Sequence, residues 1–288
     1  MRIFKWLLAG LVALSLFFLG GIAYIGAWKI VFPDRTHETA APELPAELAH
    51  PSVLLFSKTN SFRHKDGIPA GLALFERIVS ERGGSTFATE NGAIFSPELL
   101  ARFDTVVFNN ASGDTLNDEQ EAAFIASLEG GGGWIGIHAA GDSSHRDWEW
   151  YVETLIGGLF TQHTMGPQFQ DATLVVEDAA HPATENLPAS WTHNEEWYSW
   201  DRSARESGAN ILVKVDESTY SPRSIMFGTD VDLRMGDHPM VWSRCIGKGR
   251  ALYSGLGHAG AAYETPEYAA LLEGALAWTA GLEGEGCR

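Results

Sequence analysis

Three histidine side chains follow short apolar runs, at points where a strand would end and a loop begin. His138 ends one such run, His258 follows a second through a Gly-Leu-Gly turn, and His64 lies in the polar loop after residues 52–56. An imidazole titrates near neutral pH and can carry protons or bind a metal ion. Because ligands bind beyond the carboxyl ends of parallel strands, we expect the three histidines to share one site, together with Arg63 and Asn110 as substrate-binding residues.

The segment around His138 also excludes two kinds of chemistry. Residues 136–140 form a strand-to-helix turn of the kind that carries the nucleophile in many α/β enzymes. His138 occupies the nucleophile position, and Ser143 and Ser144 come only later. Glutaminase and serine-hydrolase activities are therefore not expected. His138 could act as an acid, a base or a metal ligand, or it could simply bond to a neighbouring carbonyl.

The irregular middle of the chain holds further imidazole and carboxylate groups. These are His163, His193, Glu195 and Glu196. Such groups can bind zinc or another divalent ion, although their spacings match no established metal motif. A divalent metal is therefore one possible cofactor, with His138, His163 and His258 as candidate ligands.

Carboxylates alternate with aromatic residues over positions 195–200. This composition suits a sugar, whose hydroxyl groups accept and donate hydrogen bonds while its C–H face lies on a ring. We take Trp197 and Trp242 as candidate sugar-binding residues, although aromatic packing in the core is the alternative. Neighbouring strand residues face opposite sides, so only one glutamate of the pair is expected to serve, and we assign Glu196.

The order of strands and helices indicates an α/β fold. Apolar strands are predicted at 52–56, 86–89, 104–109 and 134–138, and helices at about 68–82, from 96, at 117–130 and at 266–280. This alternation predicts a flavodoxin-like, doubly wound parallel sheet. After residue 168 the pattern becomes mixed, with strands at 173–176, 211–215, 240–245 and 250–254, the last two forming a hairpin.

The N-terminal region predicts a membrane anchor. An uncharged run from Trp6 to Trp28 follows Arg2 and Lys5 and is long enough to span a bilayer. Its preceding positive charges place the N-terminus in the cytoplasm and the remainder outside, on the periplasmic side in a bacterium. Small residues at 25–27 offer only a poor cleavage site, so an uncleaved anchor is favoured. We divide the chain into an anchor (1–31), an extended, mobile Pro/Ala/Glu linker (32–51), one domain (52–281) and a tail (282–288).

The net charge and the cysteine content restrict the partners and the compartment. A formal charge of −17 argues against nucleic acid and against docking on anionic lipid beyond the anchor. Cys245 and Cys287 are the only cysteines. A buried structural thiol is the expected role of Cys245, although an oxidising compartment would permit a bridge between the two.

Six stretches together resemble the ThuA-like (trehalose utilisation) family. They are 62–64, 131–140, 157–160 with His163, 176–183, 194–198 and 238–258. The resemblance implies a class I glutamine amidotransferase-like fold without the catalytic cysteine. It also implies a role in sugar metabolism, on trehalose and related disaccharides or their 3-keto derivatives. Its matching polar positions are His64, His138, His163, Glu196 and His258. At 162–164 the chain has Gln-His-Thr where the family has His-Pro, so the local loop differs.

Two functional hypotheses follow. In the first, the chain is an enzyme for a glycoside or keto-sugar, with His138 and His258 as proton carriers or metal ligands and Glu196 orienting the substrate. In the second, it is a membrane-anchored sugar-binding or scaffold module without catalysis. The convergence of several titratable groups favours the enzyme, whereas the missing nucleophile favours the module.

Overall fold

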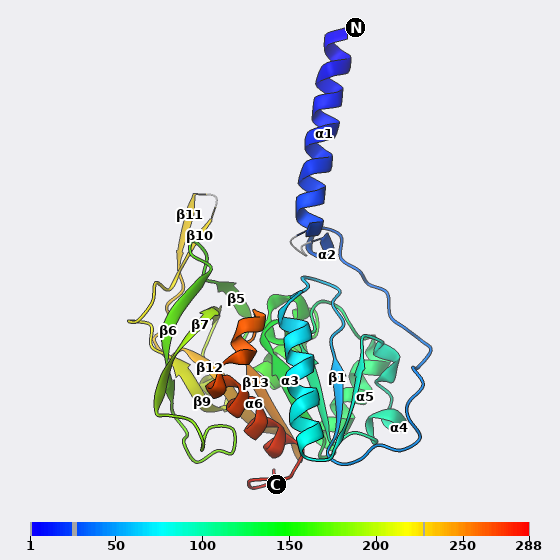
Figure 1. Ribbon diagram of the computed structural model, residues 1–288, viewed down its shortest axis with the longest axis vertical. Helices are drawn as coiled ribbons and strands as arrows, with labels where there is room; N and C mark the ends of the chain where they lie inside the picture. Colours follow the sequence, from blue (N-terminus) through cyan, green and yellow to red (C-terminus); the bar gives the residue numbers. More distant parts are fainter. Residues whose placement is uncertain (1, 25–27, 227, 288) are drawn as a thin grey trace.

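A nine-stranded sheet organises the chain in the computed structural model, in the order β2-β1-β3-β4-β13-β12-β9-β6-β7. The structure describes residues 2–24, 28–226 and 228–287. Helices cover the sheet, and one long N-terminal helix projects away from it (Figure 1). The sheet has a parallel half and an antiparallel half, and both contribute to the site.

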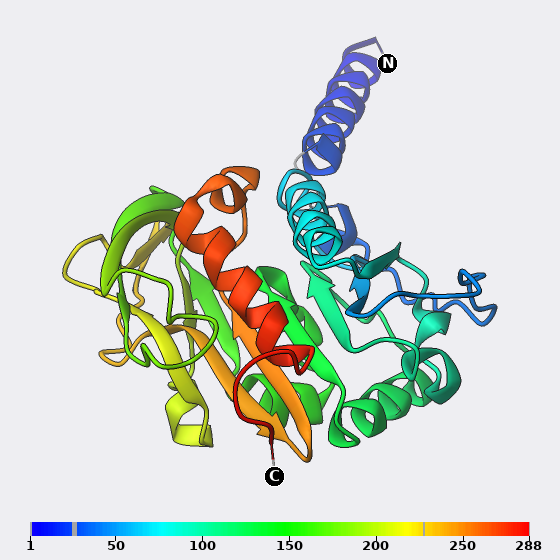
Figure 2. The same ribbon diagram turned by 60° about the horizontal axis from the view of Figure 1, so that its bottom comes forward.

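The parallel half is the predicted doubly wound unit, and the flavodoxin-like fold is confirmed. Its strands are β1 (Ser52–Phe56), β2 (Ser85–Thr89), β3 (Thr105–Asn109), β4 (Gly133–Ile137) and β13 (Gly249–Ser254). Helices α3 (Gly67–Glu81) and α6 (Pro266–Thr279) lie together on one face, and α4 (Pro97–Leu100) and α5 (Asp118–Glu129) on the other (Figures 1 and 2). The central strands β1, β3 and β4 are buried along their whole length, which explains why their sequences are continuous apolar runs.

The antiparallel half adds β12 (Pro239–Ile246), β9 (Asn210–Val215), β6 (Phe169–Val176) and β7 (Ser190–Glu196) to the same sheet. Two small ribbons flank it. They are β5 (Phe160–His163) with β8 (Tyr198–Trp200) and β10 (Arg223–Met226) with β11 (Thr229–Asp232). The predicted hairpin at Gly247 is confirmed. Strands β5, β7, β10 and β11 were not predicted because many of their residues are polar or only partly buried, and β8 was not predicted because it has only three residues.

Local signals in the sequence explain where the helices of the parallel half begin and end. The Ser96 side chain accepts a hydrogen bond from Leu99 N at the start of α4. Asn117 and Gln120 form a reciprocal capping box at the start of α5. Gly83 follows α3 with a φ of +72°, a conformation that favours glycine.

The N-terminal segment forms helix α1 (Arg2–Tyr24), followed by the short α2 (Trp28–Val31). Residues 4–24 are long and apolar enough to cross a membrane or to serve as a signal sequence, and their apolar stretch is not buried against the rest of the described chain. The candidate cleavage site at 25–27 lies outside the described residues.

Residues 32–51 form no helix or strand, but they are attached to the domain. Lys58 Nζ donates to Glu38 at 2.8 Å, and Gln120 Nε2 donates to the Glu38 carbonyl at 2.8 Å. Arg102 donates to the carbonyl of Pro45. The expectation of a mobile linker overlooked these contacts, because side chains far along the chain make them.

Cys245 and Cys287 form a disulfide, with their Cα atoms 5.5 Å apart. The preferred expectation, a buried thiol at Cys245, is wrong, because Cys245 lies on the exposed side of the outer end of β12. The bond ties the C-terminal tail to the sheet across 42 residues. A closed loop of that length removes unfolded-state entropy worth about 4 kcal/mol in the chain-entropy model.

We therefore expect Cys287→Ser to lower the free energy of unfolding by about 2–4 kcal/mol. Unfolding in denaturant, with and without a reductant, checks this. The reductant should destabilise the parent chain and leave the variant unchanged. Equal sensitivity of the two chains would contradict the bond.

Candidate functional site

Four side chains converge at the carboxyl edge of the sheet. His64 follows β1, His138 follows β4, Glu196 ends β7 and His258 follows β13. One ligand atom from each lies within 4.8 Å of those of the other three. His64, His138 and Glu196 are buried, and only His258 is partly exposed. The predicted grouping of three histidines thus matches their placement, and we call these four residues the cluster.

The backbone at His138 adopts a strained conformation. Its φ is +47°, and Asn110, at the equivalent position after the neighbouring β3, has a φ of +53°. Residues other than glycine rarely adopt such angles, and those that do concentrate at functional sites. The turn after β4 thus has the sharp geometry that presents a side chain above a sheet.

A hydrogen bond fixes the tautomer of His138. Its Nδ1 donates to the carbonyl of Gly255 at 2.8 Å, which leaves a lone pair on Nε2. Nε2 lies 3.0 Å from His258 Nδ1 and 3.4 Å from Glu196 Oε2. Burial lowers the pKa of His138 to about 4, so its imidazole is neutral and can accept a proton or bind a cation.

Glu196 and His258 form the charged part of the cluster. Glu196 Oε2 lies 3.0 Å from His258 Nδ1. Burial opposes the charge on Glu196, but its contacts with the His138 and His258 side chains outweigh this effect and hold its pKa well below the usual range. Burial likewise lowers the pKa of His258, but Glu196 reverses this effect and the pKa is raised. A negative carboxylate therefore faces two imidazoles in a site largely closed to water.

His64 has an unsatisfied group. Its Nδ1 is buried and has no hydrogen-bond partner within the described part of the chain. Its ring centre lies 4.4 Å from that of His258 and 4.9 Å from that of His138. Burial, with the neighbouring imidazoles, lowers its pKa well below the usual value, so it is neutral. A buried ring nitrogen without a partner, placed beside three other candidate ligands, fits a site that accommodates a ligand.

His163 and Gln168 hold the other oxygen of Glu196. His163 Nδ1 lies 3.1 Å from Glu196 Oε1 and 2.9 Å from the Thr164 carbonyl, and Gln168 Nε2 donates to the same carboxylate oxygen. His163 is 31 % exposed, so it sits between the cluster and solvent. In the neutral form of this imidazole, Nδ1 carries the hydrogen that these oxygens accept and Nε2 has the lone pair.

Glu195 is a residue whose position the sequence did not predict. Its Oε2 accepts a hydrogen bond of 2.7 Å from the backbone N–H of Gly257, beside His258. Burial raises its pKa to about 7. Both glutamates thus contact the loop that carries His258, although adjacent strand residues were expected to face apart.

The other predicted site residues lie elsewhere. Trp197 and Trp242 are fully or almost fully buried, and their indole N–H groups donate to the carbonyls of Gln170 and Ile156. They belong to the core, so the expectation that they bind sugar is corrected. Arg63 points outward and pairs with Glu90 at 2.7 Å. Asn110 is buried beside the cluster loop, where it donates to the Gly257 carbonyl.

The cluster has the dimensions of a metal site. Tetrahedral zinc with bonds of about 2.0 Å separates its ligand atoms by roughly 3.3 Å. The three contacts among His138, His258 and Glu196 measure 3.0, 3.0 and 3.4 Å. Three imidazoles, once deprotonated, and one carboxylate suit zinc and other first-row divalent ions. The observed donors thus fit such an ion, with His64 as the fourth ligand.

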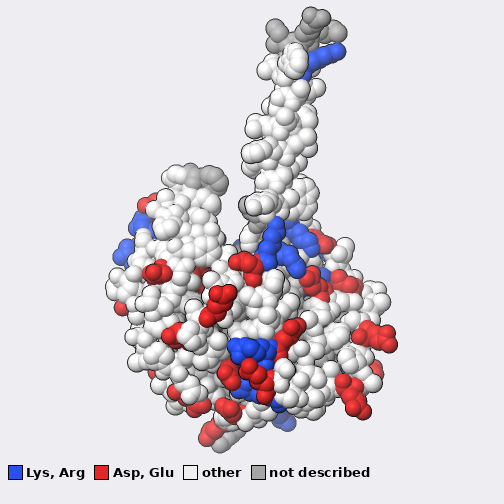
Figure 3. All heavy atoms as spheres, in the orientation of Figure 1, with Lys and Arg blue, Asp and Glu red and all other residues white. Residues whose placement is uncertain are grey.

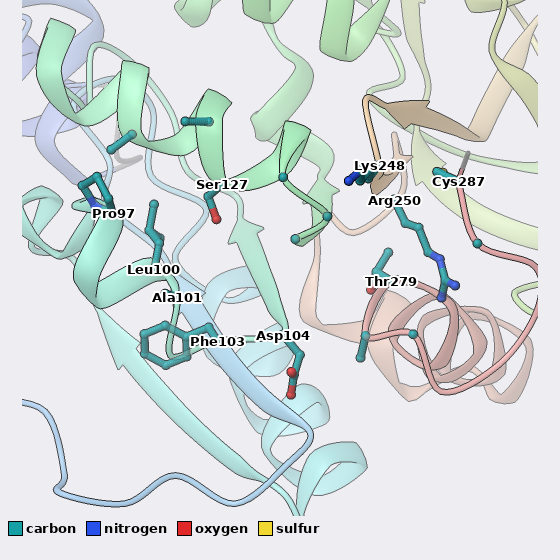
Figure 4. Close-up of a pocket in the computed structure, with 18 residues that line it drawn as sticks. Pro97, Leu100, Ala101, Phe103, Asp104, Ser127, Lys248, Arg250, Thr279 and Cys287 are labelled. Carbon is teal, nitrogen blue, oxygen red and sulfur yellow. The ribbon is translucent and has the colours of Figure 1, made fainter.

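A hollow of about 630 Å³ lies at the opposite, amino-terminal edge of the sheet (Figure 4). Pro97, Asp104, Lys248 and Arg250 are among the residues that line it. Arg250 donates to the Trp278 carbonyl and lies over the Trp278 ring, so its charge has a structural role. We therefore assign chemistry to the carboxyl edge.

Comparisons with known proteins agree with this architecture. The family model ThuA, described as trehalose utilisation, matches residues 52–279. A putative ThuA-like protein from Bacteroides uniformis is 25% identical, with a TM-score of 0.69, and the match covers 83% of this chain and 95% of that one. One from Parabacteroides merdae is 21% identical, with a TM-score of 0.56 over 80% of this chain and 89% of that one. No curated protein matches.

Zn²⁺ should raise the melting temperature of the chain, because a ligand at 100 times its Kd stabilises the folded state by about 2.7 kcal/mol. His138→Ala and Glu196→Gln should abolish that shift. His50→Ala is the matched control, since His50 is exposed and outside the cluster. A shift that survives both cluster substitutions would contradict the assignment.

Metal binding should also release protons, in a number that depends on pH, because the raised pKa of His258 favours its protonated form and metal ligands must be deprotonated. His138, with a pKa of about 4, has no proton to release. Calorimetry in buffers of different ionisation enthalpy measures this number, which should fall as the pH rises. Release that does not change with pH would contradict the role of His258.

Proposed function

The chain belongs to the ThuA family, and we propose that it is a membrane-anchored enzyme that acts on a disaccharide or glycoside in its 3-keto form. The cluster carries this proposal, because it combines a carboxylate and three neutral or poised imidazoles in one buried position. A site that only bound sugar would not need such groups out of water, where burying them is costly.

The cluster would hold a divalent cation, which acts as a Lewis acid on a carbonyl or hydroxyl oxygen of the substrate. Glu196 supplies the negative charge that the ion needs, and Gln168 and His163 orient its carboxylate. The bond from His138 to the Gly255 carbonyl keeps Nε2 directed to the cluster. These supporting bonds are the ones that a metal-binding site requires.

His163 is the best-placed general base. Its Nδ1 contacts Glu196 and its side chain is partly exposed, so a substrate entering from solvent can reach it. In a 3-keto glycoside, the C2 hydrogen is acidic because it lies next to the carbonyl. Transfer of that proton to His163 Nε2 leaves the electron pair at C2, which expels the oxygen at C1. The protonated imidazole then returns its proton to the departing oxygen, so the reaction is an elimination without net redox change.

The location of the protein rests on two features. Helix α1 is apolar enough to span a bilayer, and the positive residues before it favour a cytoplasmic N-terminus. The Cys245–Cys287 disulfide supports an oxidising compartment, such as the periplasm, for the domain.

The proposal predicts that a 3-keto disaccharide is cleaved and that the sugar exchanges its C2 hydrogen in D₂O. His163→Asn should lower kcat by about 10²–10⁴, because a general base contributes that much. His138→Ala should do so as well and should also remove the metal. Mass spectrometry of products and of deuterium incorporation measures both effects.

His50→Ala, exposed and remote, should retain full activity. Cleavage unaffected by His163→Asn would reject its role as the base. Saturable binding of sugars without any product, in the presence of divalent metals, would instead support the non-catalytic binding module.

A further inference from the structure

Exposed large apolar side chains are concentrated on one side of the domain. Outside α1, the described residues of this kind are Trp28, Ile30, Val31, Phe32, Phe169, Ile225, Met226 and Leu282. Leu282 lies near the C-terminus. The others lie at the foot of α1, on the β10–β11 hairpin or, in the case of Phe169, beside His258, at the partly exposed side of the cluster that we call its mouth. Soluble proteins rarely expose so many apolar side chains together. Their position on the side from which an apolar helix emerges indicates a surface that contacts a membrane.

The hairpin and α1 project in the same direction. In the view of Figure 1 the tip of the β10–β11 hairpin points the same way as α1 and reaches the level of the last turns of that helix. Ile225 and Met226 near the tip are 45 % and 43 % exposed. The charged residues of the hairpin form pairs, with Arg223 to Asp230 and Arg234 to Asp232 both at 2.7 Å, and Asp230 lies directly across from Ile225. Ile225 and Met226 are therefore exposed beside charges that are neutralised in pairs.

Two lysines mark the level at which α1 meets the domain. Lys65 Nζ donates to the Tyr24 carbonyl at 2.5 Å, and Lys29 Nζ donates to the Thr59 carbonyl at 2.6 Å. Figure 3 shows basic side chains gathered at this foot of the helix, below a long stretch of α1 without charged side chains. Lysines with apolar stems are typical of the headgroup level of a membrane.

Helix α1 and the β10–β11 hairpin, the two projecting elements, both contact segments that carry or hold cluster residues. Lys65, which contacts α1, follows His64 in the chain. On the other side, Ile225 N donates to the Met165 carbonyl at 2.7 Å, and Gln168 of the same loop donates to Glu196. The cluster thus lies between the two projections, with Phe169 at its mouth, 4.9 Å from the His258 ring.

We infer that the carboxyl edge of the sheet faces the lipid bilayer and that the β10–β11 hairpin inserts its apolar tip into the membrane interface as a second contact beside α1. This rests on the anchoring proposed above and extends it, since an anchor alone would leave the domain free to turn. The contact is apolar, which agrees with a chain whose net charge of −17 disfavours attraction to anionic lipid. The mouth of the cluster then opens next to the membrane surface.

The full chain in phosphatidylcholine nanodiscs tests this. Both native cysteines are bonded, so Met226→Cys adds one free thiol for an environment-sensitive fluorophore. Ser80→Cys, exposed at the end of α3 away from α1, is the matched control. We expect the label at 226 to emit at shorter wavelength and to be quenched several-fold more strongly by lipids with a headgroup-level spin label than the label at 80. Adding Ile225→Asp should reduce both effects.

Equal, water-like emission at the two positions in chains that elute with nanodiscs would overturn the hairpin contact and leave the anchor intact. A full chain that does not associate with nanodiscs at all would overturn both. The activity assay on 3-keto sugars is independent of either result, so the failure of the proposed chemistry is distinguishable.

Discussion

The parallel pairing of β4 with β13 is the constraint on which the site depends. It aligns Ile137 with Ser254, so the residues that follow both strands meet. The Gly255 carbonyl consequently accepts the His138 Nδ1 hydrogen. His258, three residues after Gly255, lies with its Nδ1 3.0 Å from His138 Nε2. This one bond decides which nitrogen of His138 has the lone pair, and the lone pair decides whether the cluster can bind a cation.

The antiparallel half of the sheet supplies the carboxylates of the site, whereas the parallel half supplies the histidines. Strand β7 lies at the far edge of the sheet, yet its end brings Glu196 to the two imidazoles and Glu195 to the Gly257 N–H. A doubly wound sheet alone would offer histidines without a counter-charge. The antiparallel strands therefore add a fixed negative charge, that of Glu196, to the group of imidazoles. The aromatic core around Tyr198 shields this site from water.

The sequence predicted the parts that depend on local patterns. Buried strands such as β3 and β4 are continuous apolar runs, and caps at Ser96 and Asn117 are local, so these elements were predicted to within a few residues. Placing His64, His138 and His258 together needed only the rule that parallel strands end at one edge. The burial of Trp197 and Trp242, the two roles of the Glu195–Glu196 pair and the Cys245–Cys287 bond depend on contacts between distant segments, which no local pattern encodes.

The central claim is that His64, His138, Glu196 and His258 bind one divalent cation. The most direct test is a crystal structure of the chain grown with Zn²⁺, with anomalous diffraction collected on both sides of the zinc absorption edge. The account predicts an anomalous peak about 2.0–2.2 Å from the two imidazole nitrogens of His138 and His258 and from a Glu196 oxygen. A cluster without a peak, or zinc bound only at other residues, would contradict it.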